Sequence, residues 1–172
     1  AIALPPFILG GMGIVRFDPW LLLPWILLAV SYFGFIEIRV MCSHCPHYAE
    51  PGTRSLQCWA NYGSPKLWKF RPGPLNRMER SVFFVGLIII AAYPLIFIII
   101  GQQWLLLLFF ILTTGAMAFL MGRFMCSHCM NFACPFNGVD AATQEAFFSR
   151  NPVISRAWQK DLNLTSKAGN TH

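Results

Sequence analysis

The sequence predicts an all-α integral membrane protein: a four-helix transmembrane bundle made of two parallel-repeated helical hairpins, each followed by a Cys/His metal motif. Three observations lead to this class. Of the 172 residues, 56% are hydrophobic and only 12% are charged, whereas a soluble domain carries about 25% charged residues. The apolar residues form runs long enough to cross a bilayer. A cysteine-rich motif occurs twice, each time at the end of such a run.

The first predicted hairpin has one short and one full span. Residues 1–15 are apolar but contain two prolines and a glycine cluster, so they form either a truncated span or a re-entrant segment, and the truncated span is favoured. Residues 19–38 form the next span. Trp20 and Trp25 lie near its start and Arg39 follows its end, an arrangement typical of membrane interfaces.

The second hairpin has the clearest spans. Residues 82–101 are an uninterrupted apolar run without charge, which at about 1.5 Å per residue crosses a hydrocarbon core of about 30 Å. Residues 104–121 form another span, separated from the first by Gln102 and Gln103 alone. The two spans must therefore be antiparallel neighbours joined by a tight turn.

These spans divide the chain into four segments. We predict a first transmembrane hairpin over 1–41, a cytoplasmic Cys/His loop over 42–80, a second transmembrane hairpin over 81–125, and a cytoplasmic Cys/His motif with an amphipathic tail over 126–172. In the tail, Asp140 is expected to cap a short helix, because aspartate is a favoured N-cap residue.

Basic residues predict the orientation of the chain in the membrane. The segment from Arg39 to Arg80 carries seven Lys or Arg residues and the tail from Arg123 carries five, whereas the opposite turns carry only Arg16, which Asp18 offsets. By the positive-inside rule, the loop and tail face the cytoplasm of a multi-pass protein in the cell (inner) membrane. The cytoplasm keeps thiols reduced, so metal binding is the favoured use of the cysteines.

One motif occurs twice in the same orientation. The first motif is RVMCSHC at residues 39–45 and the second motif is RFMCSHC at residues 123–129, with six of seven positions identical. Because each motif follows a predicted hairpin, the repeat predicts two parallel units related by a pseudo-twofold axis along the membrane normal. Corresponding helix ends then lie close together, so we expect the two motifs to be neighbours.

Each half of the chain offers three thiols and at least one imidazole. A C-x2-C pair lets two sulfurs bind one ion from a single turn of backbone, and thiolate and imidazole suit zinc and iron–sulfur centres. We therefore predict two four-coordinate sites, in which a residue of the other half can replace a histidine that points away. The candidate ligands are Cys42, Cys45 and Cys58 with His44 or His47, and Cys126, Cys129 and Cys134 with His128.

Zinc is the favoured metal, and an iron–sulfur cluster is the alternative. Three cysteines with a nearby histidine suit Cys3His zinc, while Cys134-Pro135 resembles the end of a bacterial ferredoxin motif whose full four-cysteine run is missing. A covalent c-type haem needs histidine directly after the second cysteine, where this chain has Pro46 and Met130. A thioredoxin-like redox pair lacks its βαβ context.

Four strings along the chain carry a resemblance to a known family: CSHCPHYAEPG, CWANYGSPKLWKFRPGP, the second CSHC near NFACP, and the closing NPVISRAW. They cover nearly the whole chain and resemble a family of small polytopic prokaryotic membrane proteins of uncharacterised activity. The resemblance implies the four-span plan. It implies no activity and no role for any residue.

Function is predicted at the level of class. The favoured hypothesis is a non-catalytic accessory or assembly subunit of a larger membrane complex. The alternatives are an iron–sulfur electron-transfer subunit linked to a membrane quinone or redox complex, and a thiol-dependent membrane enzyme or metal sensor. An enzyme is less favoured, because the sequence has no phosphate-binding glycine loop, nucleophile elbow or HExxH motif. The expected partners are the lipid bilayer and other membrane-complex subunits, and no nucleic acid, because topology explains the basic charge.

A single carboxylate lies inside a predicted span. Glu37 is about one turn from the cytoplasmic end of its helix, and a charge at such a position is costly and marks a candidate functional site. The simpler interpretation is that Glu37 pairs with Arg39 or Arg123, or reaches water, and this is the expectation.

Overall fold

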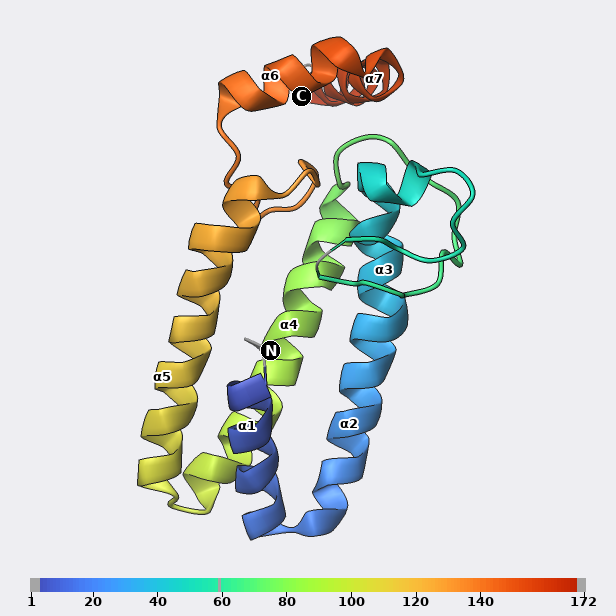
Figure 1. Cartoon of the computed structure of the whole chain (residues 1–172). Coiled ribbons are helices and arrows are strands. Elements are labelled where there is room, and N and C mark those ends of the chain that lie inside the picture. Colours follow the sequence, from blue (N-terminus) through green and yellow to red (C-terminus); the bar gives the residue numbers. More distant parts are fainter. Residues whose placement is uncertain (1–3, 59, 170–172) are drawn as a thin grey trace.

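The computed structural model describes residues 4–58 and 60–169, with side chains described as far as residue 160. Throughout this part of the chain the regular elements are helical (Figure 1). The all-helical prediction is confirmed for these residues, and three helices are, by length and composition, long and apolar enough to cross a membrane. They are Pro19–His44, Arg77–Ile100 and Trp104–His128.

The first long helix is built from several segments in series. It comprises α2 (Leu22–Ser31), a π turn (Tyr32–Ile36), α3 (Glu37–Val40) and a 3-10 turn (Cys42–His44). The helix therefore continues beyond the predicted end of the span and includes most of the first motif. The cysteines of this motif begin at the last helical turn, at one end of the bundle (Figure 1).

The second hairpin consists of α4 (Arg77–Ile100) and α5 (Trp104–Leu120), and α5 continues through a π turn (Met121–Met125). A capping box begins α4: the Asn76 side chain accepts from the Glu79 N–H, and the Glu79 carboxylate accepts from the Asn76 N–H. The predicted tight turn between the two helices is confirmed.

The remaining helix of the bundle is short. Helix α1 (Leu4–Phe17) has 14 residues and rises about 21 Å, less than the hydrocarbon core of about 30 Å. The described part of this helix is therefore shorter than a full span, and residues 1–3 of the expected span lie outside the described residues. Helix α1 packs against α4 and α5 (Figure 1). Gly10 and Gly13 allow the close approach, since a Cβ on Gly13 would overlap the Ile98 side chain.

A proline in α4 is compensated by another helix. Pro94 has no N–H, so the carbonyl of Ile90 loses its helical partner. The indole Nε1 of Trp25 in α2 donates to that carbonyl at 3.0 Å. Within lipid a freed carbonyl needs such a partner, and the bond fixes α2 against α4.

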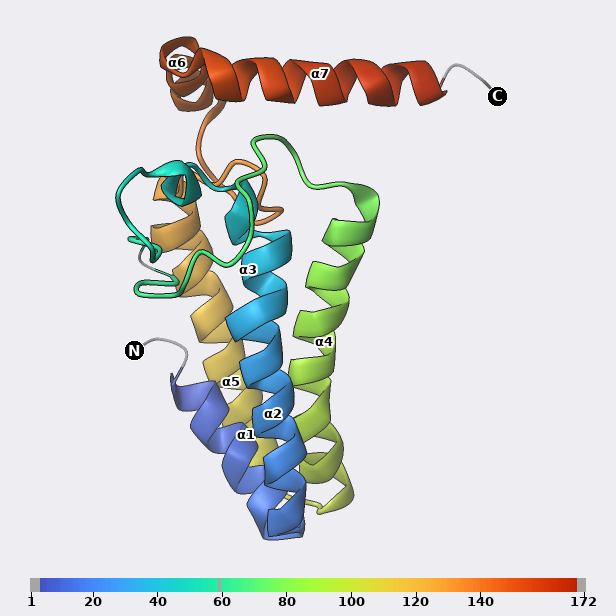
Figure 2. The same cartoon turned by 90° about the vertical axis from the view of Figure 1, so that its right-hand side faces the viewer.

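The last two helices lie across one end of the bundle, where the long loop and both motifs also lie (Figures 1 and 2). They are α6 (Ala141–Arg150) and α7 (Pro152–Gly169). The predicted cap is confirmed, because Asp140 accepts from the Thr143 N–H at 2.8 Å. The fold thus gathers all six cysteines at the end of the bundle that α6 and α7 cover.

Candidate metal centre

The two motifs end their helices in the same local conformation. In each, the Cys-Ser-His residues form a 3-10 turn, and the N–H of the second cysteine donates to the carbonyl of the first. The hydroxyl of Ser43 donates to the Arg39 carbonyl at 2.6 Å. In the second motif, Ser127 donates to the Arg123 carbonyl at 2.8 Å. Near-identical sequences therefore give the same backbone turn twice.

The surroundings of the first motif are closed. Cys42 and Cys45 are each 6% exposed, His44 is 7% exposed and Ser43 is fully buried. Residues 45–76 form a loop that folds back over the end of the helix, and Cys42 packs in a small apolar core between this loop and α3. The Arg71 N–H of the loop donates to the Ser43 carbonyl at 2.8 Å. The first motif is thus enclosed by the chain that follows it.

His44 connects this loop to α4. Its Nδ1 donates to the Gly73 carbonyl at 3.0 Å, because a carbonyl oxygen can only accept. Its Nε2 makes no hydrogen bond but lies 3.5 Å from the Glu79 carboxylate. Glu79 is 8% exposed and also pairs with Arg71 and, at 3.8 Å, with Arg39. Both ring nitrogens of His44 are therefore directed at the loop and at α4.

The second motif is more open. His128 is exposed, and its Nδ1 lies 2.9 Å from the Ser127 hydroxyl and 3.1 Å from the Phe124 carbonyl oxygen. The chain after the motif turns back at once: the Asn137 side chain donates to the Cys129 carbonyl at 2.6 Å. The second motif therefore relies on its own short loop, residues 129–138, rather than on a long covering segment.

The two motifs meet through a buried hydrogen bond. The side-chain amide of Asn131, which is 6% exposed, donates to the carbonyl of Met41 at 3.2 Å. Met41 and Ala133 belong to one apolar cluster, and Cys134 packs against it. The motifs are thus neighbours, as the repeat predicts. The Oδ1 of Asn131 is buried at this junction without a hydrogen-bond partner.

N–H groups near four thiols favour their ionisation. The Cys42 sulfur accepts a hydrogen bond from the side-chain amide of Asn61 at 3.1 Å. The backbone two residues after Cys45, Cys129 and Cys134 acts to lower the pKa of each of these thiols, although burial outweighs it. Hydrogen bonds of this kind favour the charged thiolate, which is the form that binds metals.

Burial opposes ionisation at the same thiols. It is the largest cause that raises the pKa of Cys45 to about 12 and the pKa of Cys134 to about 11, and it also raises the pKa of Cys129. On Cys45, the charges that add to the rise include Cys129 and Cys134 of the other half of the chain. Thiols from both halves are therefore within electrostatic reach of one another.

The predicted ligands are brought to one region without forming a closed cage. All six cysteines are free thiols. Among residues 4–58 and 60–169, no group of three or more His, Cys, Asp or Glu side chains is arranged to hold a metal ion. Cys58 and His47 lie half-buried in the long loop, and Cys126 is half-buried in the second motif. The division of the ligands into two sets stays a prediction.

Of the three expectations for Glu37, the pairing with Arg39 is not found among the described residues, while pairing with Arg123 and access to water stay predictions. Arg39 pairs with Glu79 of α4 instead, because residues two apart on a helix do not face each other. Glu37 lies near the thiols: burial is the largest cause that raises the pKa of Cys134, and the charge of Glu37 adds to it. The carboxylate inside the span is thus a neighbour of the cysteine region.

Three residues of this region were not identified from the sequence: Asn61, Glu79 and Asn131. The spacing Asn76-x-x-Glu79 is a capping-box signal that marks the start of α4. It does not show that Glu79 would also meet His44. Asn61 and Asn131 carry no local signal, because their partners are 19 and 90 residues away in the chain.

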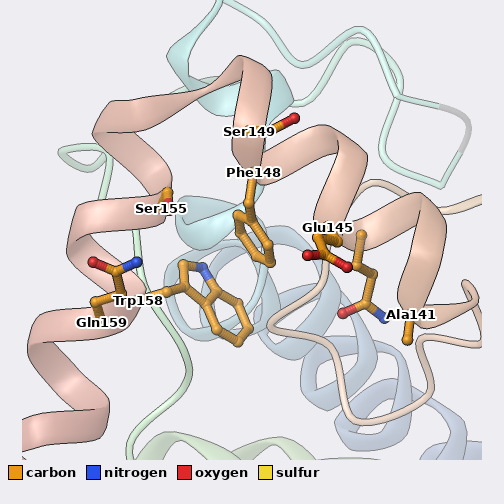
Figure 3. Close-up of a pocket in the computed structure, with 8 residues that line it drawn as sticks. Ala141, Glu145, Phe148, Ser149, Ser155, Trp158 and Gln159 are labelled. Carbon is orange, nitrogen blue, oxygen red and sulfur yellow. The ribbon is translucent and has the colours of Figure 1, made fainter.

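A separate groove of about 480 Å³ lies between α6 and α7. Phe148 and Trp158 face each other there (Figure 3), with ring centroids 5.5 Å apart. Its lining contains no cysteine or histidine. Trp158 also packs against the apolar cluster that joins the two motifs. The tail helices are therefore connected to the cysteine region by packing.

Comparison of the chain with protein-family models, with curated proteins and with solved structures gives no match. The assignment of a function therefore depends on the residues and geometry of the cysteine region.

Proposed function

We propose that this chain is an integral membrane metal–thiolate protein that serves as a non-catalytic accessory or assembly subunit of a larger membrane complex. Its metal is structural and holds the two motifs and their loops together. Zinc is the proposed metal, because it binds thiolates without redox chemistry.

The observation that carries this proposal is the junction of the two motifs. A buried hydrogen bond joins Asn131, two residues after the second C-x2-C pair, to the carbonyl of Met41, the residue before the first pair. The six thiols are free, and in a reducing compartment such a concentration of thiols is best explained by metal binding. The loop of residues 45–76 contributes only two buried side chains, Tyr48 and Leu56, to the small apolar core that it shares with α3 and Cys42. A bound metal would therefore add stability to the loop that burial alone does not supply.

The proposal includes a topology. The two hairpins form a parallel repeat of four membrane segments, with the loop, both motifs and the tail on the cytoplasmic side of the cell (inner) membrane. The distribution of basic residues supports this orientation. Helices α6 and α7, which lie across the cysteine end of the bundle (Figure 2), would present a surface to partner subunits.

An iron–sulfur electron-transfer subunit is the second candidate. The observation in its favour is Cys134-Pro135, which follows the closely spaced second pair as in bacterial ferredoxin motifs. The backbone groups that act to lower the pKa of Cys45, Cys129 and Cys134 also support it, because hydrogen bonds to sulfur tune cluster potentials. A thiol-dependent enzyme has less support, because a reactive cysteine needs a lowered pKa, whereas burial raises the pKa of Cys45 and of Cys134.

The deciding experiment is metal analysis of the full chain purified anaerobically in detergent. A colourless sample that contains zinc supports the structural role. Iron with acid-labile sulfide, and visible absorption that dithionite bleaches, supports the electron-transfer subunit. Protein without any bound metal, both as purified and after reconstitution with zinc or iron, overturns the proposal.

The structural role has its own test. Complete chelation should leave the membrane helices intact, because their backbone hydrogen bonds are satisfied within lipid. It should expose the loop, so that trypsin cleaves rapidly near Arg54 or Lys66. Far-ultraviolet circular dichroism and timed proteolysis measure the two effects. A loop that stays protected after the metal is removed would contradict a structural role.

A further inference from the structure

We propose that the loop of residues 45–76 lies in the headgroup layer of the membrane and binds anionic phospholipids. Its basic contacts are Arg54 and Lys69, and its apolar anchors are Tyr62 and Leu67. The inference rests on the membrane placement of the helices in the proposed function and adds a lipid-binding surface to it. It is independent of which metal the cysteines bind.

The depth of the loop in the membrane follows from its contacts with the first long helix. The apolar span of this helix ends before Arg39, and a basic residue there marks the headgroup level. Leu56 of the loop shares a buried core with Ile38 of the helix. The Arg71 N–H of the loop donates to the Ser43 carbonyl at 2.8 Å. Ile38 and Ser43 are about 7.5 Å apart along the helix at about 1.5 Å per residue, so these contacts cover the thickness of one headgroup layer, about 5–8 Å.

The loop also lies on the outside of the bundle. It extends beyond α3, away from α5 in Figure 1 and away from α4 in Figure 2. In both views part of the loop lies beside α3 rather than beyond its end. At this depth the surroundings of the bundle are lipid headgroups, so the outer side of the loop faces them.

A turn of the chain brings the first basic residue of this surface close to the apolar ones. Within residues 54–66 the chain turns back on itself, because the Lys66 N–H donates to the Arg54 carbonyl at 2.9 Å. Tyr62 lies in the turn between them and is 74% exposed. Arg54 is exposed and lies beside the residue that precedes Leu67. The basic and apolar residues of the surface are therefore neighbours.

The stretch that follows this turn has an inner and an outer face. In residues 65–70, exposed and partly buried positions alternate. Trp68 and Phe70 pack inward against the small core beneath the loop. Leu67, which is 54% exposed, and Lys69, which is also exposed, lie on the other side. The outer face therefore pairs an apolar with a basic side chain, as in an interfacial anchor, where the first enters the lipid and the second meets phosphate.

Charge favours anionic lipid as the occupant of this surface. The loop carries four Lys or Arg residues and one acidic residue, Glu50. Two of the basic residues are engaged within the protein: Arg71 pairs with Glu79, and the Lys66 ammonium donates to oxygens of the loop. The other two, which belong to the proposed surface, form no ion pair among the described residues. Phosphate groups supply the opposite charge, and apolar anchors at headgroup depth favour lipid over an acidic protein.

Photo-cross-linking of the full chain in vesicles of phosphatidylcholine and phosphatidylglycerol tests the depth. The photoreactive residue p-benzoylphenylalanine in place of Tyr62 or of Leu67 should form lipid adducts, which mass spectrometry detects. In place of Leu108, which is exposed on α5, it should also react with lipid. In place of Ala142, which is exposed on α6 above the loop (Figure 2), it should not.

Each pattern of adducts has a distinct meaning. Lipid adducts at Leu108 without any in the loop would overturn the inference and leave the membrane placement intact. Protein adducts instead of lipid adducts at Leu67 would identify a partner protein as the occupant and overturn it as well. Equal yields of lipid adducts at Ala142 and Leu67 would contradict the depth. Absence of lipid adducts at Leu108 contradicts the membrane placement in the proposed function instead, so the two failures are distinguishable.

The charge of the surface is tested by the binding of a fluorescent phosphatidylglycerol to the full chain in a neutral detergent. A basic residue near an anionic lipid strengthens binding by about fivefold, so Arg54→Gln and Lys69→Gln should each weaken it by about this factor. Arg150→Gln, which removes an exposed charge of α6, is the matched control and should leave binding unchanged. Fluorescent phosphatidylcholine should be insensitive to all three variants. A similar loss in Arg150→Gln, or no loss in either loop variant, would overturn the lipid-binding surface.

Discussion

The first and second motifs have the same sequence at six of seven positions but very different surroundings. His44 is 7% exposed and held between the loop and α4, whereas His128 is exposed at the end of α5. In both motifs, the serine hydroxyl donates to the carbonyl of the arginine four residues earlier, and the N–H of the second cysteine donates to the carbonyl of the first. The difference comes from the chain that follows each motif, because residues 45–76 fold back over the first and only residues 129–138 follow the second before the tail.

The two motifs therefore share their thiols and their turn but differ in the environment of the histidine. The feature common to both copies is a 3-10 turn that presents two cysteines. The histidine serves a structural role in the first copy and lies on the surface in the second. Variants at matched positions of the two motifs test whether their surroundings have different effects on stability.

The largest expected effect is at Glu79, the buried carboxylate that only the first motif contacts. Glu79→Gln leaves Arg71 and His44 without their charged partner. Because Arg71 is about one-third exposed, the free energy that stabilises the loop should fall by about 3 kcal/mol, the lower end of the range for a broken buried ion pair. Tryptic cleavage at Lys66 measures the opening of the loop. The exposed Glu145→Gln in α6 is the control and should change nothing, and equal cleavage of the two variants would refute the role of Glu79.

The histidines give a matched pair with a smaller effect. His44→Ala removes the donor to the Gly73 carbonyl and should destabilise the loop by about 2 kcal/mol, because a buried acceptor is left unpaired. His128→Ala should change stability by less than about 0.5 kcal/mol, as expected for a surface position. Hydrogen exchange of the Gly73 region and thermal unfolding measure both. Similar losses in the two variants would contradict the asymmetry.

The junction itself is tested at Asn131. Asn131→Ala removes the side-chain donor to the buried Met41 carbonyl, which keeps its hydrogen bond from the His44 N–H, and should cost about 0.5–1 kcal/mol. Hydrogen exchange should rise in residues 41–45 and in residues 129–134 together. Asn151→Ala, which removes a side-chain bond within the tail, is the control. Faster exchange in only one of the two segments would show that the motifs are not coupled through this bond.

The smallest effect is expected at the motif serines. Ser43→Ala removes a bond of a fully buried hydroxyl to the Arg39 carbonyl and should destabilise by roughly 0.5–1 kcal/mol. Ser127→Ala removes the same bond at the more open copy and should have almost no effect, because water can replace the hydroxyl. Thermal unfolding of the two variants in one detergent gives the comparison. A larger loss of stability in Ser127→Ala than in Ser43→Ala would contradict the expected order.

Much of the fold follows from local sequence. The apolar runs determine the three long helices, the Gln102-Gln103 pair determines the tight turn, and Asp140 determines the start of α6. The predicted ends of two spans, at residues 38 and 121, lie too early in the chain, because the motif residues continue each helix as π and 3-10 turns. Helix α1 is shorter than a full span.

Local sequence is enough to account for the long apolar helices, the repeated thiol pairs and the identical turn that presents them. These depend on hydrophobicity and on hydrogen bonds between residues at most four apart. The burial of His44 against Glu79 and the hydrogen bond from Asn131 to the Met41 carbonyl depend on the packing of distant segments. Contacts of this kind join residues far apart in the chain, and their partners are selected by which segment covers which helix end, a property that no local pattern encodes.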